Sequence, residues 1–185
     1  MRYGCVILAG GKSLRMKKDK ALLKIYNTTF IDCLTSEFDC FEEKLISRGK
    51  QSALIRPSWQ LLDDIYHDIG PVGGLHAALV YCESEALFTV SCDMPLVKKE
   101  LADSLISMLT DDIEAVVVKD KTGRIHPLCA VYRKSILPIV EEQIKKEDYR
   151  MQHLLDKLNV CWCMIEDDTM LKNINTPEEY QLLNR

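Results

Sequence analysis

Hydrophobic residues occur in short runs that alternate with longer stretches in which apolar and polar positions recur with a helical period. The run 3–8 is apolar throughout, which is typical of a central parallel strand buried on both faces. Alternating strands and helices predict a mostly parallel sheet with helices on both faces. The predicted strands are 3–8, 44–47, 61–62, 87–90, 115–119, 125–132 and 160–165. The predicted helices are about 30–38, 75–82, 99–109, 135–146 and 151–158.

The last third of the chain departs from this alternation. Residues 121–124 have the composition of a turn between two successive β runs, which predicts an antiparallel insertion in the sheet. Further on, Thr176 offers an N-cap, Pro177 suits the first helical position and Glu179 the third, so a C-terminal helix is expected. The pattern as a whole predicts a single-domain, three-layer α/β/α fold of Rossmann-like type.

Length and composition agree with one folded domain. The chain has 185 residues, of which 47% are hydrophobic and 28% charged, as in ordinary globular proteins. The net charge of −4 argues against a nucleic-acid binder, which would usually be basic. No apolar run approaches the roughly 18 residues of a membrane span, so no membrane association is expected. The N-terminus lacks a secretory layout and the eight cysteines form no C-x-x-C pair, so we expect a cytoplasmic protein with reduced thiols.

A basic loop led by two glycines follows the first strand. Gly10 and Gly11 end the apolar run and let the backbone turn and approach a ligand closely. Consecutive backbone N–H groups in such a turn attract anions, and nearby cations strengthen the attraction. The loop therefore predicts phosphate binding, the alternative being a solvated basic loop. It is not a Walker A loop, because Val6 stands where the first glycine is needed. Its charged residues are Lys12, Arg15, Lys17, Lys18, Lys20 and one carboxylate, Asp19.

Three further segments accompany this loop along the chain. The four are Leu8-Ala9-Gly10-Gly11-x-Ser13-x-Arg15-Met16-x-x-Asp19-Lys20, Gly70-Pro71-Val72-Gly73-Gly74, Ser91-Cys92-Asp93-Met94-Pro95 and Asn173-Ile174-Asn175-Thr176-Pro177-Glu178-Glu179. In this order and spacing they resemble the motifs of the molybdenum-cofactor guanylyltransferase family, one of the nucleotidyltransferases of the sugar-nucleotide type. The resemblance covers nearly the whole chain.

The resemblance implies a nucleotidyltransferase fold in which about 1–95 bind the nucleotide and about 96–185 bind the acceptor. It implies a Mg²⁺-dependent enzyme that transfers GMP from GTP to molybdopterin carrying molybdenum, with release of pyrophosphate. The expected partners are GTP, molybdopterin or its molybdenum form, and molybdoenzyme-maturation proteins. The protein itself is expected to act as a monomer or weak oligomer. Two alternatives stay open: a cytidylyl- or other nucleotidyltransferase with another phosphorylated acceptor, and a non-catalytic nucleotide-binding accessory protein.

The resemblance also implies roles for residues on the nucleotide side. Arg15 and Lys20 are the expected catalytic cations. The sequence Leu-Ala-Gly-Gly at the end of the first strand resembles that of the guanylyl-transferring branch of the family. Cytidylyltransferases tend to have Leu-Ala-Ala-Gly at this position. The family usually has Met-Gly before its Asp-Lys pair; here Lys17 follows Met16, which leaves the loop conformation open. The implied nucleotide-binding residues are Leu8, Ala9, Gly10, Gly11, Lys20, Asp64, Gly70, Pro71 and Asp93.

Carboxylates at predicted strand ends are the candidate ligands of a metal or nucleotide. Asp93 follows a buried strand, where a carboxylate has little structural purpose, and Mg²⁺ favours carboxylate oxygens. Asp93 is therefore the candidate Mg²⁺ ligand, the alternative being a cap of the turn before Pro95. By resemblance Asp64 is the nucleotide-side carboxylate; Asp63 takes that role if the loop is shifted by one residue, and both alternatively belong to an acidic surface loop.

On the acceptor side, the resemblance indicates His126, which precedes Pro127, and Asn175. His126 is alternatively a satisfied polar residue, and Asn175 a turn residue that prepares the helix cap. The segment 70–74 stands ahead of a predicted helix N-terminus, where free N–H groups favour anions. For Gly74, a need for tight packing of the helix on a strand explains the choice of glycine equally simply.

Overall fold

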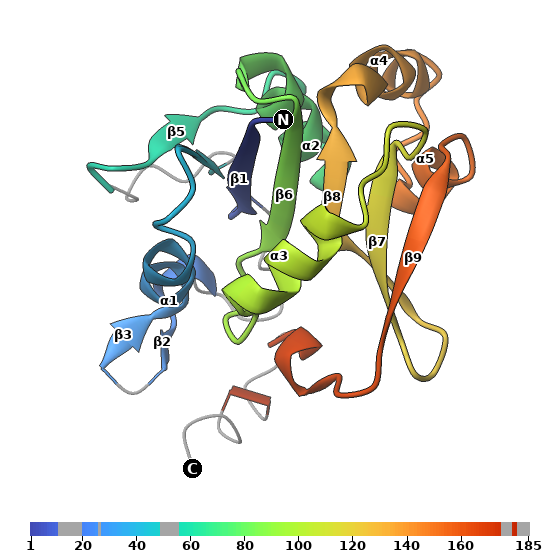
Figure 1. Cartoon of the computed structure of the whole chain (residues 1–185). Helices are drawn as coiled ribbons and strands as arrows, with labels where there is room; N and C mark the ends of the chain where they lie inside the picture. The colour runs from blue at the N-terminus through green and yellow to red at the C-terminus, as the bar shows by residue number, and fades with distance from the viewer. Residues whose placement is uncertain (11–19, 26, 49–55, 175–178, 181–185) are drawn as a thin grey trace.

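The structure is a computed structural model that describes residues 1–10, 20–25, 27–48, 56–174 and 179–180. Its centre is a seven-stranded sheet in the order β5-β4-β1-β6-β8-β7-β9 (Figure 1). The strands are β1 Tyr3–Leu8, β4 Glu43–Ser47, β5 Gln60–Leu62, β6 Ala86–Ser91, β7 Ala115–Asp120, β8 Ile125–Arg133 and β9 Val160–Ile165. All predicted strands of the sheet are confirmed.

Strand direction places the ends of most strands along one edge of this sheet. β1 pairs in parallel with β4 and β6, β4 with β5, and β7 with β9. β8 is antiparallel to both β6 and β7, which confirms the predicted antiparallel insertion. The C-terminal ends of the parallel strands and the start of β8 therefore share one edge, called the carboxyl edge below. Ligands of open α/β sheets bind at such an edge.

Helices cover both faces of the sheet, so the predicted three-layer architecture is confirmed (Figure 1). Successive side chains of β1 point to opposite faces of the sheet and are buried on both. Cys5 and Ile7 face the layer of α1 and α3, whereas Val6 and Leu8 face the layer of α2, α4 and α5. All four are at most 5% exposed. The helices are α1 Phe30–Glu37, α2 Pro71–Tyr81, α3 Lys99–Ser107, α4 Leu137–Lys145 and α5 Met151–Leu155, with 3₁₀ turns η1 Lys20–Leu22, η2 Lys134–Ile136 and η3 Thr169–Leu171.

One helix begins earlier than the sequence predicts. We expected a turn over 70–74 and a helix from Leu75, but α2 begins at Pro71. Proline suits the first helical position, and Gly70 supplies the positive φ of 74° that turns the chain into the helix. Gly73 lies inside the helix. Glycine is required there because a Cβ would stand 2.8 Å from the main-chain oxygen of Tyr66. The prediction was wrong because Gly73 and Gly74 lie in the first helical turn for close packing, which their helix propensity alone does not indicate.

The remaining differences are local. A short hairpin of β2 Lys24–Ile25 and β3 Thr28–Thr29 precedes α1 and was not predicted. The helix predicted over 135–146 starts as the 3₁₀ turn η2 before α4. The start of the predicted C-terminal helix, 175–178, lies outside the described residues; residues 179–180 are helical. No helix among the described residues has the length and apolar character that a membrane crossing requires.

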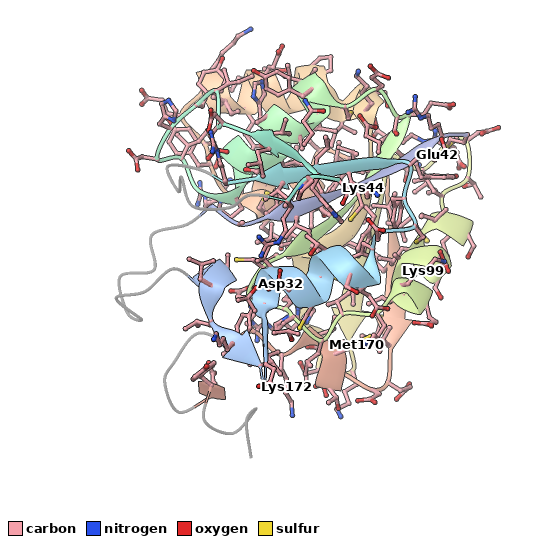
Figure 2. All side chains as sticks on the ribbon, turned by 90° about the vertical axis from the view of Figure 1, so that its left-hand side faces the viewer. Asp32, Glu42, Lys44, Lys99, Met170 and Lys172 are labelled. Atoms are coloured by element: carbon pink, nitrogen blue, oxygen red, sulfur yellow. The ribbon has the colours of Figure 1, made fainter. Side chains whose placement is uncertain are left out.

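Residues close to the C-terminus pack beside the short hairpin that precedes α1. Ile174 packs in a small apolar cluster with Leu23, Ile25 and Phe30. Figure 2 shows the neighbouring side chain of Lys172 at the end of the molecule where β2 and β3 lie, well away from Glu42. The C-terminal segment therefore crosses the molecule to reach the part that follows the first strand.

Candidate active site

The end of β1 is fixed between its two neighbours at the carboxyl edge. The backbone N–H groups of Ala9 and Gly10 both donate to the carbonyl oxygen of Ser47, at 2.7 and 3.0 Å. On the other side, the N–H of Cys92 donates to the carbonyl oxygen of Leu8 at 3.0 Å. Ala9 is buried and Gly10 is exposed, so the basic loop leaves the sheet at its centre. The predicted residues Leu8, Ala9 and Gly10 are thus held by β4 and β6.

The rest of the loop is only partly described. Gly11 and Arg15 lie outside the described residues. Lys20 begins η1, where the chain returns towards β2. The first strand end and the start of η1 therefore define where the loop leaves and rejoins the described fold.

Two adjacent aspartates after β5 have different environments. Asp64 accepts a hydrogen bond from the hydroxyl of Ser47, with 2.8 Å between Oγ and Oδ1. Asp63 instead pairs with both Nε and Nη2 of Arg48, at 2.9 and 3.2 Å, and this guanidinium lowers the pKa of Asp63. Asp63 is engaged by an ion pair, whereas Asp64 is tied to the residue that holds the end of β1. The geometry favours Asp64 as the carboxylate next to the loop.

The first turn of α2 packs directly on the same strand ends. A Cβ added at Gly74 would lie 2.8 Å from Oγ of Ser47 and 3.2 Å from Cδ2 of Leu8. This close approach brings Gly70 and Pro71, at the N-terminus of α2, to the carboxyl edge. Helix N-termini favour anions there, because their first N–H groups lack partners within the helix.

Asp93 lies in the turn that follows β6. The N–H of Met94 donates to the carbonyl oxygen of Ser91 at 3.0 Å and closes this turn, and Oδ1 of Asp93 is buried. The described residues contain no group of three or more His, Cys, Asp or Glu side chains that would enclose a metal ion. Mg²⁺ commonly binds through one or two carboxylates together with substrate phosphates, and a single aspartate agrees with that mode of coordination. Asp93 is thus compatible with Mg²⁺ shared with a triphosphate.

A second group of predicted residues lies further along the carboxyl edge. His126, at the start of β8, is 7% exposed and lines a cavity of about 500 Å³. Its Nε2 lies 3.1 Å from Oδ2 of Asp120, the last residue of β7. Asn175 lies outside the described residues. The cavity is also lined by Leu96, Arg124, Asp168, Thr169, Leu171, Lys172, Asn173, Ile174 and Glu179.

Asn173 begins the fourth motif, but no role was assigned to it from the sequence, although the Asn-x-Asn spacing with Asn175 was a signal for one. Its Oδ1 is buried and has no hydrogen-bond partner among the described residues. A buried acceptor left in this state costs about 1–3 kcal/mol, so a ligand donor at this position would be stabilising. The next residue, Ile174, donates its N–H to the carbonyl oxygen of Asp93 at 2.8 Å. The cavity is therefore joined directly to the turn that carries the candidate metal ligand.

Fold and site together define an α/β protein with two adjoining ligand regions, one at the ends of β1, β4 and β6 and one at β7 and β8. The family model for the MobA-like NTP transferase domain matches residues 5–161. The chain belongs to this family, and it is thus a nucleotidyltransferase by family.

Curated relatives agree with this assignment, and a solved structure agrees with the fold. The chain is 34% identical over 182 residues to the probable molybdenum cofactor guanylyltransferase of Flavobacterium johnsoniae, covering 96% of this chain and 94% of that one. It is 30% identical to the protein of the same name from Clostridium perfringens, covering 100% and 98%. The crystal structure of molybdopterin-guanine dinucleotide biosynthesis protein A from Archaeoglobus fulgidus superposes with a TM-score of 0.82 at 21% identity, covering 98% and 96%. This last likeness concerns the fold alone.

Proposed function

We propose that this protein transfers GMP from GTP to molybdopterin carrying molybdenum, forming molybdopterin guanine dinucleotide and pyrophosphate. The observation that carries the proposal is the hydrogen bond from Ile174 N–H to the carbonyl oxygen of Asp93. It joins the loop-and-carboxylate region to a cavity whose lining includes His126 and Asn173. Transfer between two bound substrates requires two such adjoining regions. The names of the relatives support the choice of nucleotide and acceptor.

The reaction needs little proton transfer from the protein. An oxygen of the acceptor phosphate bonds to the α-phosphorus of GTP, while the bond from that phosphorus to the bridging oxygen of the β-phosphate breaks and pyrophosphate leaves. Positioning and charge stabilisation then account for most of the catalysis. In the proposal, the backbone at Gly10 and Gly11 and the cations Arg15 and Lys20 hold the phosphates.

Asp93 would hold Mg²⁺ in the same proposal. When bound, Mg²⁺ neutralises charge that develops on the α-phosphate and on the leaving pyrophosphate. Asp64 would contact the nucleotide near the end of β4, and the N-terminus of α2 at Gly70 and Pro71 would favour its negative charge. His126, Asn173 and Asn175 would contact the acceptor.

Nucleotide preference tests the proposal most directly. With Mg²⁺ present, GTP at a hundredfold excess over its Kd is expected to stabilise the protein by about 2.7 kcal/mol. For a chain of this size that corresponds to a rise of about 5–10 °C in Tm. CTP, ATP and UTP at the same concentration serve as controls and should shift Tm far less. A preference for CTP would retain nucleotidyl transfer and replace the product, whereas no response to any nucleotide would contradict the proposal.

The two adjacent aspartates provide a matched pair of variants. Asp64→Ala is expected to raise the Kd for GTP about tenfold, because it removes both the proposed contact and the partner of the Ser47 hydroxyl. Asp63→Ala breaks only an exposed ion pair with Arg48, so it should change the Kd less than about twofold. Calorimetric titration with GTP measures both. The reverse order of effects would assign the nucleotide-side role to Asp63.

A further inference from the structure

The carboxylate of Asp120 is saturated with hydrogen-bond donors. Its Oδ1 accepts from the N–H of Thr122 at 2.8 Å, the hydroxyl of Thr122 at 2.6 Å and the N–H of Arg124 at 3.1 Å. Its Oδ2 lies 3.1 Å from Nε2 of His126. The Thr122 hydroxyl, followed by His126 and these backbone N–H groups, holds the pKa of Asp120 well below its usual range. Asp120 is therefore ionised and acts only as an acceptor.

The backbone holds His126 in a fixed place opposite this carboxylate. The pairing of β7 with β8 jumps from Val117↔Ala130 to Val118↔His126, so residues 127–129 form a bulge. Proline at 127 has no N–H to give to the ladder, and a bulge accommodates it. The buried hydroxyl of Tyr132 donates to the carbonyl oxygen of Pro127 at 2.8 Å and pins the bulge from within. The bulge thus places His126 at the carboxyl edge, opposite Asp120.

These contacts decide which ring nitrogen of His126 bears the proton. Because Asp120 only accepts, a neutral His126 must carry its hydrogen on Nε2, which leaves Nδ1 with a lone pair. Among the residues that the structure describes, the His126 ring bonds through Nε2 alone. His126 lines the cavity together with Asn173, whose buried Oδ1 is a second acceptor. Two acceptors at one cavity match a ligand that presents N–H donors, such as the amino-pyrimidinone edge of a pterin.

We propose that Asp120 is a positioning residue, which sets the Nε2–H tautomer of His126 so that Nδ1 accepts a hydrogen bond from an N–H group of the acceptor substrate. The proposal rests on the proposed function for the identity of that substrate. It predicts that reversing the tautomer weakens acceptor binding without touching the nucleotide region. A purely structural Asp120, serving only to close the turn between β7 and β8, predicts no such selective effect.

Asp120→Asn separates the two roles. The amide oxygen of asparagine can still accept from Thr122 and Arg124, so the turn between β7 and β8 is retained. Its NH₂ group then faces Nε2 of His126, which must become the acceptor and move the ring proton to Nδ1. We expect ¹⁵N spectra of the ring nitrogens to show Nε2–H in the parent protein and Nδ1–H in the variant. The His126 signals are those lost in His126→Gln.

Steady-state kinetics test the consequence. In Asp120→Asn the KM for the acceptor is expected to rise about tenfold or more, because a donor now faces a donor, while the KM for GTP stays within about twofold. Asp148→Asn is the matched control: it alters a second His–Asp pair, with Nδ1 of His153 2.7 Å from Oδ2 of Asp148, which does not line the cavity. It should leave both KM values unchanged.

Three results would overturn the proposal: an Nδ1–H tautomer in the parent protein, an unchanged tautomer in Asp120→Asn, or a reversed tautomer with an unchanged acceptor KM. A parent protein that binds GTP but does not transfer GMP would contradict the proposed function instead. In that case the spectra still decide whether Asp120 sets the tautomer, and titration of both proteins with pterin as the probe decides whether the tautomer matters for binding.

Discussion

Asp93→Asn is expected to lower kcat for GMP transfer by about a thousandfold, the largest effect among the substitutions that we predict. Charge stabilisation by a bound metal contributes several kcal/mol to such a transition state, and about 4 kcal/mol corresponds to that factor. Asparagine keeps the size of the side chain but removes its negative charge. The turn should persist, because Met94 and Ile174 bond to main-chain oxygens in this segment, not to the carboxylate.

Turnover, Tm and metal titration together check this expectation. The Tm of Asp93→Asn should stay close to that of the parent protein, while the GTP-dependent binding of Mg²⁺, followed by calorimetry, weakens strongly. Asp103→Asn is a suitable control, since it neutralises an exposed carboxylate on α3 that pairs with Lys99. A parent-like rate in Asp93→Asn would remove Asp93 from the mechanism and return it to the role of a turn residue.

The layers of the fold were predictable because they depend on local patterns. The apolar run of β1 reports burial on both faces, and Thr29 forms the capping box with Asp32 that begins α1. Strand order depends on long-range contacts that no local pattern encodes. β8 lies between β6 and β7, although β7 precedes it in the chain. The turn at 121–124 predicted an antiparallel strand, but not which neighbour it would pair with on its other edge.

The candidate site divides in the same way. Asp93 was recognisable because a carboxylate at the end of a buried strand is locally unusual, and His126 because its His-Pro pair resembles a segment of the family. Ser47 and Asp120 were not, because their importance comes from partners that folding brings to them. Ser47 is an ordinary small residue until its carbonyl oxygen accepts from Ala9 and its hydroxyl donates to Asp64. Cross-strand register creates these contacts, so sequence spacing alone does not reveal them.

Gly73→Ala tests whether the first turn of α2 positions the residues of the nucleotide region. The sign of its effect on the free energy of unfolding is diagnostic. Helix propensity alone predicts that alanine stabilises the helix interior by about 1 kcal/mol. The structure predicts the opposite, because the added Cβ would lie 2.8 Å from the main-chain oxygen of Tyr66 and 2.9 Å from Cγ1 of Ile69. Such overpacking costs typically about 1–3 kcal/mol. We therefore expect a net loss in the free energy of unfolding, measured by urea denaturation.

The same substitution should also impair nucleotide use. Tyr66 is two residues beyond Asp64, so a main-chain shift that relieves the clash displaces the segment that carries this carboxylate. A displacement of about 1 Å at a site can cost about a hundredfold in rate, and we expect a loss of kcat/KM for GTP of that order. Gly74→Ala is the matched control: its Cβ meets the hydroxyl of Ser47, so adding Ser47→Ala should recover stability there. At Gly73, truncation of Ile69 would remove one close contact but not the other, because that partner is the peptide carbonyl oxygen of Tyr66. A stabilised Gly73→Ala with parent-like kinetics would show that the segment between Asp64 and α2 shifts without cost. It would also show that α2 does not position Asp64.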